Sequence, residues 1–130
     1  MQTTHKVPSA LRIWFVIHFA ADIAFAIPLF VAPRGFLALL GWTEVDPIAT
    51  RLVAAALFGI GIQSWLGRNE PREVYLGMLN LKIIWSLSAS LGLAISIAQG
   101  GPPMAWMFLL IFAAFCALWS SWRVRLARAA

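Results

Sequence analysis

The chain has 130 residues and a net charge of +5, with 62% apolar and only 12% charged residues. An average soluble domain has about 45–50% apolar and about 25% charged residues, and a domain this short leaves much of its surface in water. The composition therefore excludes an ordinary soluble protein. The basic residues lie at the ends of apolar runs, which favours lipid headgroups as their partners and argues against nucleic acid.

Four apolar runs are each close to the roughly 20 residues that a helix needs to cross a hydrocarbon core. The predicted spans are residues 10–31, 48–66, 74–98 and 104–122. Turn-forming segments rich in Pro and Gly separate them. Because the runs are continuously apolar rather than alternating, they favour helices over the strands of a barrel. We therefore predict an all-α fold, an integral membrane four-helix bundle in a single transmembrane domain covering residues 1–130.

The first span contains two polar residues at membrane depth, His18 and Asp22. A separation of four residues places them on one face of a helix. At a rise of about 1.5 Å per residue they lie roughly 12 and 18 Å from the start of the span. A charged group near the bilayer centre costs about 2.5–3.5 kcal/mol on insertion scales, so such residues usually face the bundle interior and pair.

The connection between the first two spans carries a short apolar stretch, residues 36–42, which we expect to form a helix at the outer interface. Arg51 then opens the second span. It either pairs with Glu44 or Asp46 or binds an anionic headgroup or ligand. Aromatic residues near the predicted inner ends, among them Trp119 and Trp122, fit interfacial positions.

The third span contains Asn80 and Lys82 in its first half. Lys82 lies about 12 Å from the start of its span, a depth that matches His18. We therefore predict a buried cluster of Asp22, His18 and Lys82 with Asn80 close by, as a ligand or ion site. Three roles remain open for this cluster: polar contacts that hold the bundle together, a binding pocket, and a proton relay. A Lys82 side chain that reaches back to the headgroups is a further alternative.

The basic residues also predict the orientation. Seven of them flank one side: Lys6, Arg12, Arg68, Arg72, Arg123, Arg125 and Arg128. Only Arg34 and Arg51 flank the other side. The positive-inside rule then places both termini in the cytoplasm.

Catalytic and metal sites have little support in the sequence. Two histidines, His5 and His18, are the only ones present, and His5 precedes the first span. One chain therefore lacks a second histidine at membrane depth for haem ligation. No nucleophile with a matching base, phosphate-binding loop or metal-ligand spacing is present. We expect no enzyme activity, no catalytic residue, no metal and no cofactor.

One arrangement resembles a known group. A proline-containing turn, Pro33-Arg34-Gly35, ends the first helix, and an apolar stretch leads to Gly41-Trp42. Arg51 then opens a glycine-containing second helix that ends near Trp65 and Arg68. This half of the chain resembles small bacterial four-helix membrane proteins of the DoxX-like and related families. The resemblance implies a multi-pass protein of the bacterial inner membrane and implies no activity.

Together these observations predict a small membrane protein that binds a hydrophobic or amphipathic ligand or serves as an accessory subunit of a membrane complex. The alternative is an oligomeric, ion-coupled small transporter or channel that uses Asp22. The expected partners are the lipid bilayer and either further copies of the chain or a larger membrane complex.

Overall fold

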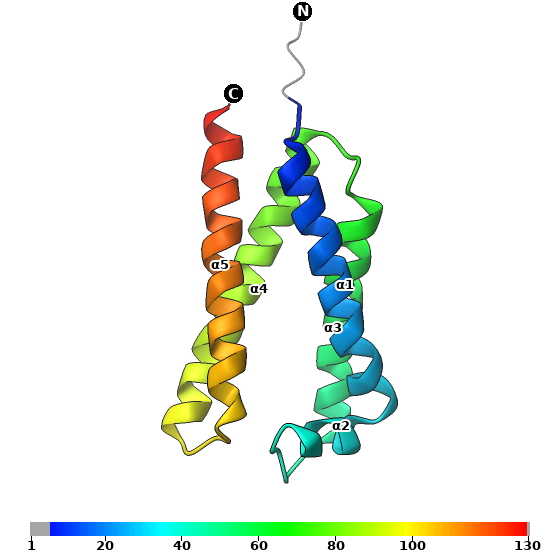
Figure 1. The fold of residues 1–130 in the computed structure, drawn as a ribbon, viewed down its shortest axis with the longest axis vertical. Coiled ribbons are helices and arrows are strands. Elements are labelled where there is room, and N and C mark those ends of the chain that lie inside the picture. The colour runs from blue at the N-terminus through cyan, green and yellow to red at the C-terminus, as the bar shows by residue number, and fades with distance from the viewer. Residues whose placement is uncertain (1–5, 130) are drawn as a thin grey trace, which may run out of the picture. The chain divides into compact units, whose positions relative to one another are not determined.

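The structure, a computed structural model, describes residues 6–129, and this part of the chain forms five helices (Figure 1). They are α1 (Ser9–Val31), α2 (Pro33–Leu39), α3 (Pro47–Leu66), α4 (Arg72–Ala98) and α5 (Met104–Arg128). Four of the described helices, α1, α3, α4 and α5, are long and apolar enough to cross a membrane. The all-α prediction with four long apolar helices and one short helix is therefore confirmed.

The helix boundaries differ from the prediction in α2 and α5. Helix α2 covers Pro33–Leu39 rather than residues 36–42, and α5 continues to Arg128 rather than ending at residue 122. Hydropathy marks where lipid contact stops, whereas a helix continues for as long as its residues favour it. The added residues include Arg, Leu and Ala, which are strong helix formers. Basic residues in the last turn also interact favourably with the C-terminal end of the helix dipole.

The beginning of α3 is set by a local cap. The Asp46 carboxylate accepts hydrogen bonds from the backbone N–H groups of Ile48 at 2.8 Å and Ala49 at 3.3 Å. Pro47 occupies the first turn, where its missing N–H costs nothing. Asp46 is thus the N-cap of α3, and the loop that follows α2 ends at this residue.

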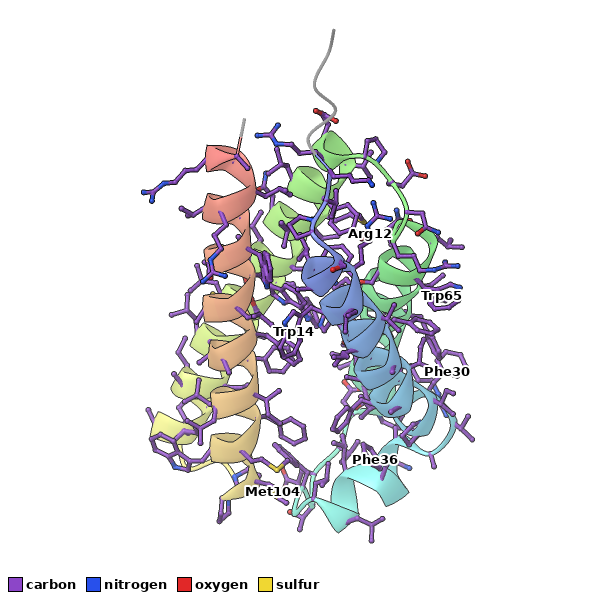
Figure 2. The ribbon with its side chains drawn as sticks, turned by 45° about the horizontal axis from the view of Figure 1, so that its top comes forward. Arg12, Trp14, Phe30, Phe36, Trp65 and Met104 are labelled. Atoms are coloured by element: carbon purple, nitrogen blue, oxygen red, sulfur yellow. The ribbon has the colours of Figure 1, made fainter. Side chains whose placement is uncertain are left out.

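The helices form two compact units. One contains residues 12–68, with most of α1 and all of α2 and α3, and the other contains α4 and α5 together with the start of α1. In the first unit α1 packs against α3 through aromatic contacts. Phe30 lies near the α2 end of α1 and Trp65 lies toward the opposite end of the pair (Figure 2). The Phe30 and Phe58 rings are 6.0 Å apart, and the Phe19 and Trp65 rings are 5.3 Å apart.

The second unit is built on an antiparallel hairpin of α4 and α5 (Figure 1). Helix α4 ends in a turn that only glycine adopts easily, because Gly100 has a φ of 89°. The N–H of Gly100 bonds to the carbonyl of Ile97, and the N–H of Gly101 bonds to the carbonyl of Ser96. These two bonds make a Schellman motif, which satisfies carbonyls that the helix end would otherwise leave unpaired. The motif reverses the chain so that α5 returns along α4.

Candidate functional site

Two polar side chains meet inside α1. The His18 Nε2 atom lies 3.3 Å from Asp22 Oδ1, and the residues are only 4% and 6% exposed. They belong to one buried stripe of α1. Its members in the first unit are Phe15, His18, Asp22, Ala26 and Leu29. The spacing of three and four residues follows the helical repeat, so the pair lies on the buried face of α1.

Helix α3 comes unusually close to α1 beside this pair. A Cβ atom added to Gly61 would lie 2.8 Å from the Cβ of Asp22 and 3.4 Å from its Oδ2. Any side chain at position 61 would therefore collide with the carboxylate residue. Gly61 itself is buried, and so is Ser64 one turn later, whose hydroxyl donates to the carbonyl of Ile60 at 2.8 Å. Gly61 thus determines how closely the backbone of α3 approaches Asp22.

Sequence reasoning missed the role of Gly61. It is one of two glycines in the second span, the other being Gly59. The glycine that meets α1 could have been recognised by its register, since Gly61 lies three residues before Ser64 and four after Leu57 on the buried face.

Lys82 is the third predicted member of the site, and it is buried in the α4–α5 unit with 2% exposure. Its Nζ lies 5.0 Å from the centroid of the Trp119 ring on α5. This is a cation–π contact, which a desolvated setting strengthens. The Trp119 side chain is completely buried, and its position at the membrane interface stays a prediction. The Trp119 ring thus faces the Lys82 ammonium within the hairpin.

Asn80 also contacts α5. Its side-chain oxygen accepts a hydrogen bond of 2.8 Å from Arg123 Nε. Sequence reasoning placed Asn80 beside the Asp22 and Lys82 cluster and assigned no partner to Arg123. The observed bond is charge-assisted, so it connects the two helices of the hairpin more strongly than a neutral pair would.

The predicted residues are therefore found in both units. His18 and Asp22 lie in the first, whereas Lys82 and Asn80 lie in the second. The pairing of Asp22 with Lys82 remains a prediction. Arg51, the fifth predicted residue, donates from Nε to the carbonyl of Phe30 at 3.0 Å and so caps the end of α1.

The His18–Asp22 pair combines an acceptor with a group that can donate. A carboxylate accepts hydrogen bonds or binds a cation, and a neutral imidazole carries one N–H donor and one acceptor nitrogen. No match to this chain is found among models of known protein families, curated proteins or solved structures. Within residues 6–129, no group of three or more His, Cys, Asp or Glu side chains is placed to hold a metal ion. The assignment of function therefore depends on the chemistry of the side chains described above.

Proposed function

We propose that the chain is a multi-pass membrane protein that binds an amphipathic molecule, with the polar group of that molecule held at the His18–Asp22 pair. The observation that carries this proposal is the 3.3 Å contact between two side chains that are both more than nine-tenths buried within an apolar helix. Ionisable residues at membrane depth are rare and commonly mark binding sites or ion pathways.

The surroundings of the pair support an amphipathic rather than a purely polar ligand. The buried stripe of α1 continues from Asp22 to Ala26 and Leu29, so apolar side chains follow the polar pair along the same face. A polar or cationic group bound at the carboxylate would leave its hydrocarbon portion beside these residues.

A second candidate is an ion-coupled transporter or channel formed by several copies of the chain. The contact between His18 and Asp22 favours it, because an imidazole beside a carboxylate is an arrangement that transfers protons. In both cases we place the chain in the bacterial inner membrane with its termini in the cytoplasm, as the basic flanks and the resemblance to DoxX-like proteins imply. The four long helices would then form one bundle.

Native mass spectrometry of the detergent-purified chain tests the two candidates together. The wild type is compared with Asp22→Asn, which keeps the size of the side chain and removes its charge. Glu44→Gln is the matched control, since Glu44 is an exposed residue outside the helices. A small molecule retained by the wild type and by Glu44→Gln but lost from Asp22→Asn supports the binding proposal.

Spectra without a bound molecule, identical in all three proteins, contradict the binding proposal. Proton flux in liposomes then tests the second candidate. A flux carried by the wild type and abolished in Asp22→Asn supports the transporter, and the absence of flux in the wild type contradicts it.

A further inference from the structure

Apart from the buried Lys82, the charged residues of the α4–α5 hairpin lie at one end. Four arginines lie where α4 begins and α5 ends: Arg72, Arg123, Arg125 and Arg128. Two glutamates accompany them, Glu70 and Glu73, and the Glu73 side chain is 77% exposed and lies 3.9 Å from Arg72 Nη1. The turn at the other end, residues 99–103, contains no charged residue. The arginine end is therefore the polar end of the hairpin.

The lengths of the helices indicate where this end lies in a bilayer. Helix α4 has 27 residues and α5 has 25. At about 1.5 Å per residue they are roughly 40 and 37 Å long, whereas the hydrocarbon core is about 30 Å thick. The uncharged turn can remain near the opposite interface, so the excess length belongs to the arginine end. The last turns of α5 then extend into the headgroup layer.

Two of the four arginines hold the hairpin together. Arg72 donates from Nε to the carbonyl of Leu126 at 3.0 Å and from Nη2 to the carbonyl of Ala127 at 3.2 Å. Arg123 donates to Asn80. The Arg72 bonds satisfy carbonyls at the end of α5, and the bonds of both arginines attach α5 to α4. The end of α5 is therefore fixed in position rather than left to fray.

The other two arginines face outward on this fixed helix end. Arg125 and Arg128 are exposed, and their separation of three residues places them on one side of α5. The Arg125 guanidinium lies 5.4 Å from the centroid of the Trp122 ring, a cation–π contact that orients it. Trp65 and Arg68 repeat the same spacing at the end of α3, at 3.7 Å. Tryptophan rings favour the headgroup level, and guanidinium groups match phosphate oxygens in a bidentate manner.

We propose that Arg125 and Arg128, on the helix end held by Arg72 and Arg123, form a binding surface for the phosphate groups of anionic phospholipids. The charge, the excess helix length and the tryptophan beside Arg125 point to the same occupant. This surface is independent of the His18–Asp22 pair.

The test measures lipid binding to the detergent-purified full chain by native mass spectrometry, with phosphatidylglycerol and phosphatidylcholine titrated in parallel. Arg125→Gln with Arg128→Gln is compared with the control Lys6→Gln with Arg34→Gln, which removes two exposed charges elsewhere. A basic residue near an anionic surface contributes roughly a fivefold change in affinity, so the first variant, which lacks two, should bind phosphatidylglycerol about 25-fold more weakly. The control should bind it more tightly than the first variant does, and Glu44→Gln, at an exposed acidic residue outside the helices, should bind it as the wild type does.

Several results would overturn this assignment. Wild-type affinity for phosphatidylglycerol no higher than for phosphatidylcholine would overturn it, and so would an equal loss in both double variants. Inorganic phosphate that binds in place of the lipid, and is lost with Arg125 and Arg128, would assign the surface to free anions instead. If the Gln variant does not fold, the Lys variant at both positions retains the charge and should show an intermediate affinity, because it loses bidentate contacts. Wild-type affinity in that Lys variant would contradict bidentate recognition.

Discussion

Replacement of Gly61 by alanine should force α1 and α3 apart at the polar pair. The new Cβ would lie 2.8 Å from the Cβ of Asp22. Carbon atoms pack best at about 3.5–4.0 Å, so the shortfall is roughly 0.7–1.2 Å. The atom it meets is attached directly to the α1 backbone, so rotation of the Asp22 side chain cannot relieve the clash. Overpacking of this kind costs about 1–3 kcal/mol.

Gly59→Ala provides the matched control, because an added Cβ there has no atom within 4 Å. Both substitutions raise the helix propensity by the same amount. The difference between the unfolding free energies of the two variants therefore reports the contact with α1. Unfolding of the purified protein by SDS in mixed micelles, followed by circular dichroism, measures both free energies. We expect Gly61→Ala to unfold more easily than Gly59→Ala by about 1–3 kcal/mol. Equal stability of the two variants would refute the close approach of α1 and α3 at Asp22.

Three further predictions concern contacts that are local to one unit. A double-mutant cycle of Lys82→Met and Trp119→Leu should show a coupling of about 0.5–2 kcal/mol in the free energy of unfolding, measured in the same assay. Strictly additive effects of the two substitutions would contradict the cation–π contact. Asp46→Ala should destabilise the chain by about 1 kcal/mol through loss of the α3 cap, whereas the neighbouring Glu44→Ala should have little effect; equal losses would argue against capping. Arg72→Gln should speed hydrogen exchange in the last turn of α5, because it removes two hydrogen bonds to the carbonyls there. Mass spectrometry measures the exchange, and an unchanged rate would disprove the anchoring role of Arg72.

The number and position of the long helices could be predicted because hydropathy is a property of the chain itself. A span needs about 20 apolar residues wherever its neighbours lie. The Schellman turn at Gly100 and the cap at Asp46 are equally local, since both bind backbone groups within a few residues. The end of α5 was predicted six residues too early, because the helix continues through polar residues that hydropathy does not count.

At the candidate site, the contact within one helix could be predicted from the sequence, whereas the contacts between helices could not. The His18–Asp22 contact could be predicted because residues four apart meet on any α-helix. The contacts of Lys82 with Trp119, of Asn80 with Arg123 and of Gly61 with Asp22 join different helices, and sequence reasoning found none of the three.

By itself, the sequence determined four apolar helices, the turns between them and the polar pair within the first helix. Only the tertiary structure decided which face of each helix meets its neighbour. The sequence of a helix that is apolar on every side says little about which face packs. Lipid tails are as apolar as the side chains they contact, so the hydrophobic effect favours no particular rotation of the helix about its axis. Close packing at a glycine and a few polar contacts make the choice, and these depend on atoms that are distant in the chain.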